Sequence, residues 1–235
     1  MSSTLGTLRA IADVHGHPQR MEAAAGDADN LVLLGDLVDR GPDSAGALRL
    51  ALSWIEKGRA KLVRSNHDDK LYRFLKGNRV RMNPDLAGTL SSLDDAKDGA
   101  TLKDRFMQIY AETPHVLRLG KYVFAHGAVS SYHFAMPEQP LSLTRLRRRI
   151  EKMALFGEVN GSRDDQGRPI RFYDWVEKLP SDITAIVGHD RRGNEPVFHE
   201  TENGGRAIFL DTGCGKGGPL SYIDLPAENI GQVFD

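Results

Sequence analysis

Acidic, imidazole and amide side chains stand directly after six short apolar runs of this chain. Carboxylate and amide oxygens mixed with imidazole nitrogens, without a set of thiolates, suit Mn, Fe, Zn or Mg. The pattern therefore predicts a metal site, and two ions that share one carboxylate are its natural form. The segments are Asp13-Val14-His15-Gly16, Gly35-Asp36-Leu37-Val38-Asp39-Arg40-Gly41, Arg64-Ser65-Asn66-His67-Asp68, His126-Gly127, Gly188-His189 and Asp211-Thr212-Gly213-Cys214.

Each segment taken by itself also has a purely structural interpretation. Asp13 and His15 could form a solvated turn, and residues 36–40 could form a turn closed by a surface ion pair. Asn66 could cap a following helix, since Asn is a favoured cap residue. A single histidine such as His126 is more often a hydrogen-bonded core residue than a ligand. The recurrence of such groups after six apolar runs favours the metal site.

Short buried strands that alternate with helices must position these groups. We expect an α/β fold of the β-sandwich type, flanked by helices, with the site where the carboxyl ends of the strands meet. Apolar runs predict the strands, and apolar residues at helical spacing predict the helices. The expected strands are 8–12, 31–34, 60–63, 122–125, 185–187 and 207–210, and the expected helices are 18–26, 44–57 and 68–77.

The remaining segments carry weaker patterns. Residues 91–114 are expected to be helical and polar, whereas 130–140 and 157–169 are expected to be loops. Substrate choice is expected to depend on 91–114 and 130–169, which would lie over the crevice. No repeat or low-complexity linker divides the chain, so residues 1–235 are interpreted as one catalytic domain.

Composition excludes several classes of protein. The 235 residues include 31 Lys and Arg against 32 Asp and Glu, for a net charge of -1, which argues against a DNA-coating protein. Cys214 is the only cysteine, so a disulfide scaffold or zinc finger is excluded. No apolar stretch reaches the roughly 18 to 20 residues needed to span a bilayer, and no signal peptide is recognisable. A cytoplasmic protein without membrane contact is expected.

The segments in this order resemble the metallophosphoesterase superfamily, and within it the calcineurin-like phosphoprotein phosphatase branch. That branch carries DxH, GDxxDRG, GNH[DE], a later His and then GH, and the likeness covers essentially the whole chain. A narrower resemblance is to phosphatase domains of bacterial polynucleotide kinase-phosphatases and to small bacterial phosphatases of the dinucleoside-tetraphosphatase type. It rests on Asp69-Lys70-Leu71, Arg73-Phe74-Leu75-Lys76-Gly77 and the segment 211–214.

The resemblance implies a role for each matching residue. His67, paired with Asp39, would donate a proton to the leaving oxygen. Arg40 would bind the phosphoryl oxygens, together with Asn66 and His67. The cofactors would be two divalent ions, Mn, Fe, Zn or Mg, with Mn the first choice in vitro. Asp13 and His15 would hold the first ion, Asp36 would bridge both, and Asn66, His126 and His189 would complete the second.

The expected activity is hydrolysis of phosphate monoesters, in phosphoproteins or small phosphoesters, by direct attack of a hydroxide that bridges the ions. The alternative substrates are dinucleoside polyphosphates, cleaved symmetrically, or terminal phosphates of nucleotides. A catalytically silent metal-binding or phosphate-binding module is a further hypothesis. It is disfavoured by His67, Asp39 and Arg40, because a module that only binds needs no proton donor for a leaving group.

Residues outside the main pattern allow two interpretations each. The basic cluster Arg145 and Arg147 to Arg149 could be a solvated helix face, or Arg148 or Arg149 could bind substrate phosphate. Nucleic-acid binding by this cluster is disfavoured, because few aromatic residues lie beside it to stack bases. Asp211 could orient a histidine of the site or simply end a strand.

Three positions depart from the family pattern without removing a ligand. Ser65 replaces the usual glycine before Asn-His, which is expected to tighten a turn. Gly127-Ala128 reverses the commoner order, and Asp190 replaces a threonine and adds negative charge near the site. The glycines at 213, 215 and 218 fit a dinucleotide-binding pattern, but a strand-like segment follows where that motif requires a helix.

Overall fold

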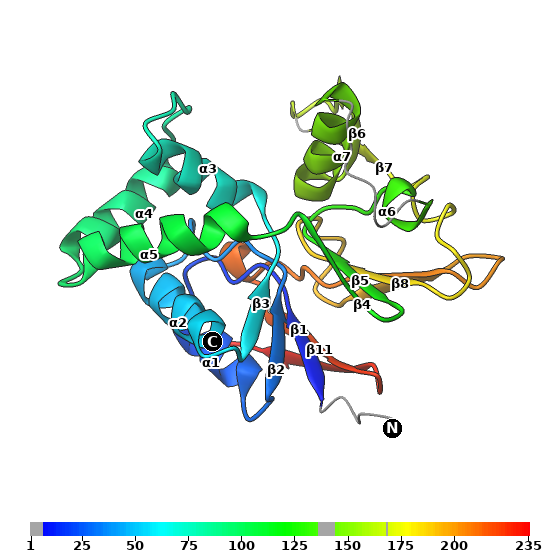
Figure 1. The fold of residues 1–235 in the computed structure, drawn as a ribbon, viewed down its shortest axis with the longest axis horizontal. Coiled ribbons are helices and arrows are strands. Elements are labelled where there is room, and N and C mark those ends of the chain that lie inside the picture. Colours follow the sequence, from blue (N-terminus) through cyan, green and yellow to red (C-terminus); the bar gives the residue numbers. More distant parts are fainter. Residues whose placement is uncertain (1–6, 136–143, 168) are drawn as a thin grey trace.

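Two five-stranded sheets organise the protein (Figure 1). The computed structural model describes residues 7–135, 144–167 and 169–235. In the first sheet β1 (Leu8–Ile11), β2 (Asn30–Leu33) and β3 (Ala60–Leu62) are parallel, and β11 (Leu220–Leu225) and β12 (Asn229–Val233) extend the other edge antiparallel. In the second sheet β5 (Tyr122–Ala125), β8 (Thr184–Val187) and β10 (Arg206–Phe209) are parallel, flanked by antiparallel β4 (Val116–Leu119) and β9 (Val197–Glu200).

A shared hydrophobic core joins the two sheets. Ala10 and Val32 of the first sheet belong to the same buried cluster as Phe124, Ile186 and Ile208 of the second. Because side chains alternate along a strand, the neighbouring residues point to the opposite face of each sheet. On that face the first sheet packs against helices, whereas the second sheet packs mainly against the segment that contains Trp175 and Leu179.

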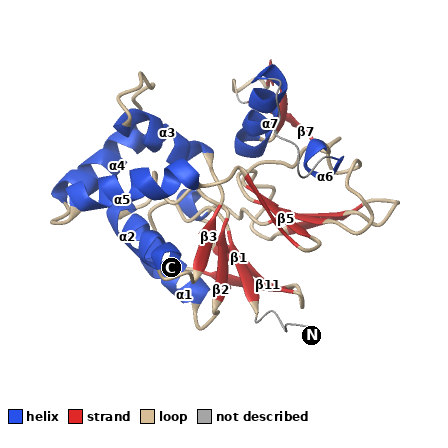
Figure 2. Ribbon diagram, in the orientation of Figure 1, coloured by secondary structure: helices blue, strands red, loops and turns tan. Residues whose placement is uncertain are grey.

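Helices lie on the outer face of the first sheet (Figure 2). Met21, Leu48 and Leu102 pack there in one cluster with strand residues such as Leu33. The helices are α1 (Pro18–Ala25), α2 (Ser44–Glu56), α3 (Asn66–Leu75), α4 (Pro84–Asp95) and α5 (Gly99–Glu112), and beside the second sheet lie α6 (Tyr132–Ala135), α7 (Thr144–Phe156) and the hairpin of β6 (Glu158–Arg163) and β7 (Pro169–Phe172).

The predicted fold class is confirmed, whereas two predictions for connecting segments are wrong. Residues 157–169 form strand β6 and the start of β7 instead of a loop, and 130–140 includes α6, with 136–140 outside the described residues. Most of β6 is exposed, so it lacks the alternating apolar pattern that marks a half-buried strand. Residues 91–114 are helical as predicted, in the end of α4 and in α5, and Leu93 and Leu102 of these helices are buried in the core beside α2.

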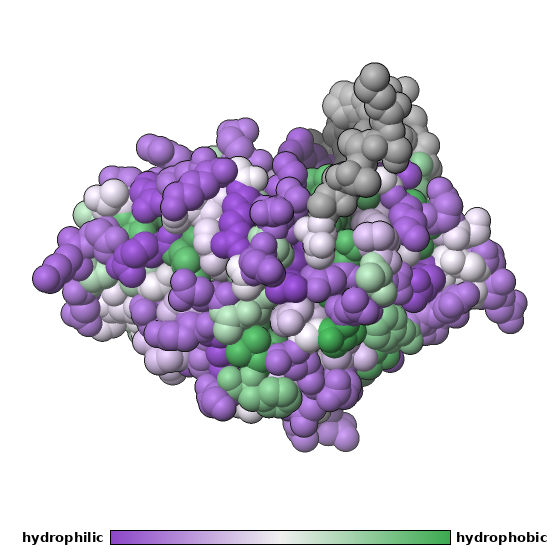
Figure 3. Space-filling model, turned by 90° about the horizontal axis from the view of Figure 1, so that it is seen from below, coloured by the Kyte–Doolittle hydropathy of each residue, from purple (hydrophilic) through white to green (hydrophobic). Residues whose placement is uncertain are grey.

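The surface is predominantly polar on the face that Figure 3 shows, with hydrophobic residues in small groups. Among the described residues, no helix combines the length and the apolar character needed to cross a membrane. The short helix η1 (Cys214–Lys216) begins at the last residue of the segment 211–214. Strand β11 follows this helix, as the strand-like sequence predicts.

Candidate active site

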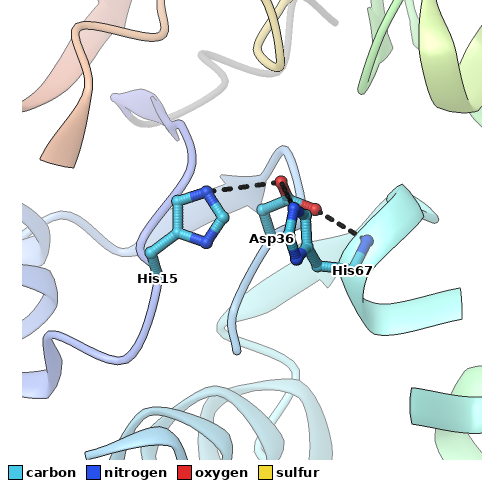
Figure 4. Close-up of side chains that lie close together, drawn as sticks. All are labelled: His15, Asp36 and His67. Atoms are coloured by element: carbon cyan, nitrogen blue, oxygen red, sulfur yellow. Dashed lines mark hydrogen bonds and ion pairs between the residues drawn. The ribbon is translucent and has the colours of Figure 1, made fainter. Parts of the chain in front are cut away.

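The carboxylate of Asp36 lies at the centre of the predicted ligands. His15 Nε2 is 3.4 Å from one of its oxygens, Oδ2, and His126 Nε2 is 3.4 Å from the other, Oδ1. The backbone N–H of His67 donates to Oδ1 at 3.2 Å, and Nε2 of the His67 ring is 3.9 Å from Oδ2, the oxygen that His15 also faces (Figure 4). Asp36 therefore separates two groups of imidazoles, which is the position expected for a carboxylate that bridges two ions.

Ligand atoms gather in two sets that share Asp36. In each set the possible ligand atoms lie within 4.8 Å of one another. Asn66 Oδ1 is 2.8 Å from His126 Nε2, and both carboxylate oxygens of Asp13 accept from the backbone N–H of His189 at 3.0 Å. The two sets are His15, Asp36 and His67, and Asp36, His126 and His189.

Two histidines present an unprotonated nitrogen towards Asp36. The Nδ1 of His15 donates to the carbonyl of Val38 at 3.0 Å, and that of His126 donates to the carbonyl of Leu34 at 2.8 Å. These bonds leave Nε2 with its lone pair directed into the site. Burial lowers the pKa of His15 to about 3 and also lowers that of His126, which keeps both rings in the neutral, metal-binding form.

Two buried carboxylates face the site, Asp13 and Asp36. Burial raises the pKa of Asp13, as does the charge of Asp211 and Asp36. Burial also acts to raise the pKa of Asp36, but the positive charge that the surrounding histidines carry when protonated, His126 foremost, lowers it below its usual range. Buried carboxylates are stable when they are paired or coordinate metals. The oxygen and nitrogen donors that meet here thus fit divalent cations.

The backbone of the site adopts an unusual conformation. Among the described residues, seven non-glycine residues have a positive φ, and six of these seven are predicted site residues. These six residues belong to three of the six predicted segments, those that follow β1, β2 and β8. The six are Asp13, His15, Asp36, Asp39, Arg40 and His189, with φ between 41° and 73°.

Two glycines of the pattern allow close approach between the segments. A Cβ at Gly188 would lie 2.2 Å from Oδ2 of Asp13, and one at Gly35 would lie 2.3 Å from Cβ of Ser65. Such distances are impossible without movement of the neighbouring chain. Gly188 therefore lets Asp13 reach the backbone of His189, and Gly35, with φ of 89°, lets β2 pass the start of α3.

His67 contacts Asp39 as predicted, and Arg40 lies beside His67. His67 Nδ1 is 2.6 Å from Oδ2 of Asp39, whose other oxygen accepts from the hydroxyl of Thr89 at 2.6 Å. The two guanidinium nitrogens of exposed Arg40 lie 2.7 Å from His15 Nε2 and 3.1 Å from His67 Nε2. Burial acts to lower the pKa of His67, but Asp36 and the hydrogen bond to Asp39 raise it overall.

Two of the family departures have structural partners. Ser65 has φ of −127° and ψ of 167°, which any residue adopts, so no strained turn results. Its hydroxyl instead accepts from the backbone N–H of Asp36 at 2.7 Å and from that of Asp68 at 3.4 Å. Asp190 accepts from the hydroxyl of Tyr173 at 2.5 Å and lies 3.4 Å from the guanidinium of Arg171. Its charge is thereby partly compensated.

Sequence reasoning missed Thr89 and Arg171. Arg171 Nη2 lies 2.8 Å from Nε2 of His189, yet it belongs to the short strand β7 and carries no motif. Thr89 lies on α4, 50 residues from the aspartate that it contacts. Thr89 lies at helical spacing between the apolar residues Leu86 and Leu93, which is consistent with its burial. No motif in the sequence indicated that it contacts Asp39 or that Arg171 contacts His189.

Two weaker candidates have other surroundings. Asp211 accepts from the backbone N–H of Gly213 at 2.8 Å, and among the described residues it makes no hydrogen bond to a histidine. Its orienting role stays a prediction. Arg148 is exposed on α7 and lines a cavity that also reaches His189, whereas Arg147 forms an ion pair with Glu151 at 2.8 Å. The solvated-face interpretation thus fits Arg147, and phosphate binding by Arg148 stays a prediction.

Comparison with known sequences identifies close relatives. The profile of calcineurin-like phosphoesterases matches residues 7–210. The asymmetrical bis(5'-nucleosyl)-tetraphosphatase PrpE of Bacillus subtilis (strain 168) is 34% identical over 200 residues, which cover 83% of this chain and 75% of that protein. The protein of the same name from Anoxybacillus flavithermus (strain DSM 21510 / WK1) is 30% identical over the same shares.

Solved structures show the same fold at low sequence identity. A chain provisionally described as a diadenosine tetraphosphatase has a TM-score of 0.63 and 24% identity, covering 99% of this chain and 95% of that one. A serine/threonine phosphatase from Saccharomyces cerevisiae with similarity to human PP5 has a TM-score of 0.60 and 17% identity, covering 100% and 81%. The family match, the fold and the donor set agree: this chain belongs to the calcineurin-like phosphoesterases and is a metal-dependent hydrolase of phosphoester bonds.

Proposed function

We propose that this hydrolase acts on dinucleoside polyphosphates, in preference to phosphoproteins. The observation that carries the proposal is the identity of 30 to 34% to two proteins named as asymmetrical tetraphosphatases, over 83% of the chain. The likeness to the yeast serine/threonine phosphatase, at 17% identity, concerns the fold alone. Sequence analysis favoured symmetrical cleavage for this substrate class. The names of the relatives favour asymmetrical cleavage, which converts diadenosine tetraphosphate and water into ATP and AMP.

Six side chains would hold the divalent ions. Ions in such a site act as Lewis acids towards phosphoryl oxygens and supply a nucleophilic water at neutral pH. Mn, Fe, Zn and Mg all accept oxygen and imidazole donors, so the donor set does not select one of them. We assign Asp13, His15 and Asp36 to one ion and Asp36, Asn66, His126 and His189 to the other, in accordance with the contacts around Asp36.

The leaving oxygen needs a proton, and His67 is placed to supply it. Asp39 holds Nδ1 of His67, so a protonated ring presents Nε2–H on the side of Arg40. After the bond from phosphorus to the leaving oxygen breaks, that oxygen takes the proton from Nε2, and Asp39 keeps the ring oriented. The planar guanidinium of Arg40 can donate two parallel hydrogen bonds to phosphoryl oxygens.

Product analysis tests the proposal. The purified protein, loaded in turn with Mn, Fe, Zn or Mg, is incubated with diadenosine tetraphosphate or with serine, threonine and tyrosine phosphopeptides. We expect ATP and AMP in equal amounts, and a kcat/KM for the dinucleotide above that for every peptide. Formation of ADP alone would show symmetrical cleavage. A higher kcat/KM for a phosphopeptide would replace the proposed substrate class by phosphoproteins.

A further inference from the structure

A cavity of about 760 Å³ adjoins the predicted metal ligand His189. Its walls come from α7, from both strands of the β6–β7 hairpin, and from the segments around Ser130 and Trp175. The volume lies within the range of small-molecule sites. Of the residues that line the cavity, only His189 belongs to the predicted metal site. The cavity therefore offers a binding surface beside the reacting phosphate that the catalytic residues leave unused.

The excess of positively charged side chains in the cavity favours an anionic ligand. Among the described residues, six cationic side chains line it, against a single carboxylate, that of Glu158. On α7, Arg145, Arg148 and Arg149 have no ion-pair partner among the described residues, in contrast to Arg147, which pairs with Glu151. The cations are Arg145, Arg148, Arg149, Lys152, Arg171 and Lys178. Because a phosphate chain that leaves the metal centre would pass these groups, it would meet several donors in succession.

The same cavity has an exposed apolar wall. Phe156 is 42% exposed and Val159 is 41% exposed, although both are large hydrophobic residues. The ring centroid of Phe156 lies 6.4 Å from that of His189. Inorganic polyphosphate would leave this wall in water, and a purely apolar ligand would leave the cations without counter-charges. A phosphate chain that ends in a flat heterocycle satisfies both features.

A second cavity, on the other side of α7, lacks this combination. Its volume is about 500 Å³, and it shares Arg148 and Lys152 with the first. Its cations are offset by Asp69 and Glu151, and no phenylalanine, tyrosine or tryptophan of the part of the chain that the structure describes lines it. It therefore offers no comparable platform on which a base could stack.

We propose that the cavity beside His189 binds a nucleoside end of the substrate, with the base stacked on the ring of Phe156 and the phosphate chain held by Arg148 and Arg149 of α7. This inference rests on the proposed function and adds the residues that recognise the nucleotide. Stacking on aromatic side chains is favourable for every base. The cavity accordingly selects nucleotides over phosphate chains without a base, and it discriminates little between bases.

Calorimetric titration with ATP and with inorganic tripolyphosphate, without added metal, measures this recognition apart from turnover. We expect Phe156→Leu to weaken ATP binding roughly tenfold and to change tripolyphosphate binding by less than about twofold. Phe156→Tyr restores ATP binding because the ring is kept. Arg149→Ala weakens binding of both ligands. Phe198→Leu is the matched control, since Phe198 is an equally exposed phenylalanine, 45%, on β9 outside the cavity.

The outcomes separate this inference from the proposed function. Equal effects of Phe156→Leu on ATP and tripolyphosphate, or no effect on ATP, would overturn the inference even if diadenosine tetraphosphate is hydrolysed. A phosphopeptide that displaces ATP and binds more tightly would overturn it as well. Loss of ATP affinity in Phe156→Leu with rescue by Phe156→Tyr supports it, and absence of dinucleotide hydrolysis in the wild type would then refute only the proposed function. Circular dichroism verifies that each variant is folded.

Discussion

Six residues of the candidate site are held in a backbone conformation that L residues rarely adopt. A non-glycine residue with positive φ costs of the order of 1–3 kcal/mol, and it persists only where the surroundings dictate it. Here Asp13 accepts from the N–H of His189, and the N–H of Asp36 is bound by Ser65. The polypeptide thus fixes the positions of these side chains through its own hydrogen bonds.

Because Asp36 is assigned as a metal ligand and His67 as a proton donor, we expect substitutions at these two residues to have different effects on bound metal. We expect His67→Asn to lower kcat about 100- to 10,000-fold, the usual contribution of general acid catalysis, while bound metal stays at the wild-type level. Asp36→Asn is expected to lose metal and activity together, because its two oxygens face both sets of ligands. Metal analysis of both purified variants beside kcat is the measurement. Equal metal loss in the two variants would contradict the separate roles.

Thr89 is expected to act by positioning Asp39. Its buried hydroxyl donates to Oδ1 of Asp39 and also accepts from the backbone N–H of that residue at 3.0 Å. Thr89→Val removes both bonds and should reduce the free energy of unfolding by about 1–3 kcal/mol, the cost of unpaired buried polar groups. It should also lower kcat with little change in KM. Urea unfolding and steady-state kinetics measure both effects, and Thr89→Ser, which keeps the hydroxyl, should restore them.

At the scale of elements, the residue that caps the N-terminus of helix α3 also contacts the candidate site. Ser65 is its N-cap residue, and the same hydroxyl binds the N–H of Asp36 on the neighbouring strand end. Where the family pattern GNH[DE] has glycine, this chain therefore has one side chain that both caps a helix and binds the backbone of a carboxylate residue. Ser65, which was expected to tighten a turn, instead makes two hydrogen bonds to backbone N–H groups.

Removing that cap should affect both stability and metal affinity. We expect Ser65→Ala to lower the free energy of unfolding by about 1 kcal/mol and to weaken metal binding, because Asp36 loses its backbone partner. Asn83→Ala is the control: Asn83 caps α4 by accepting from Leu86 at 3.2 Å and has no contact with the predicted ligands. It should cost similar stability and leave metal affinity unchanged. Parallel urea unfolding and metal titrations compare the two; equal loss of metal affinity would contradict the role of Ser65.

At the scale of the molecule, the site lies between two sheets and depends on their packing. Asp13 and Asp36 follow strands of the first sheet, whereas His126 and His189 follow strands of the second. The buried cluster that contains Phe124 holds the sheets together. Any change in the distance between the sheets would therefore separate the two halves of the ligand set.

A cavity in this shared core should consequently reduce stability and metal binding together. Phe124 is fully buried, so Phe124→Ala is expected to lower the free energy of unfolding by about 3–5 kcal/mol. Metal affinity should also fall, measured at a temperature where the variant is still folded. Phe234→Ala, at a residue that is 65% exposed, is the control and should change neither property. Unaltered metal affinity in a folded Phe124→Ala protein would show that the site does not depend on sheet packing.

The sequence by itself determined which segments form the strands that precede the candidate site residues, and which of these residues meet at Asp36. It could do so because both are local: an apolar run predicts a strand, and the residues that follow it stand at the end of that strand. The exposed hairpin β6–β7 gave no such signal, because exposure removes the selection for apolar alternation.

Only the tertiary structure decided which distant groups touch. The contact of Thr89 with Asp39 spans 50 residues, and Arg171 reaches His189 from a strand without a motif. The cavity between α7 and the hairpin likewise exists only after these elements pack. Such contacts depend on how helices and sheets lie against one another, and spacing along the chain contains no record of that packing. Local motifs therefore identify the candidate catalytic residues, whereas the contacts that position them and the cavity beside them depend on the tertiary structure.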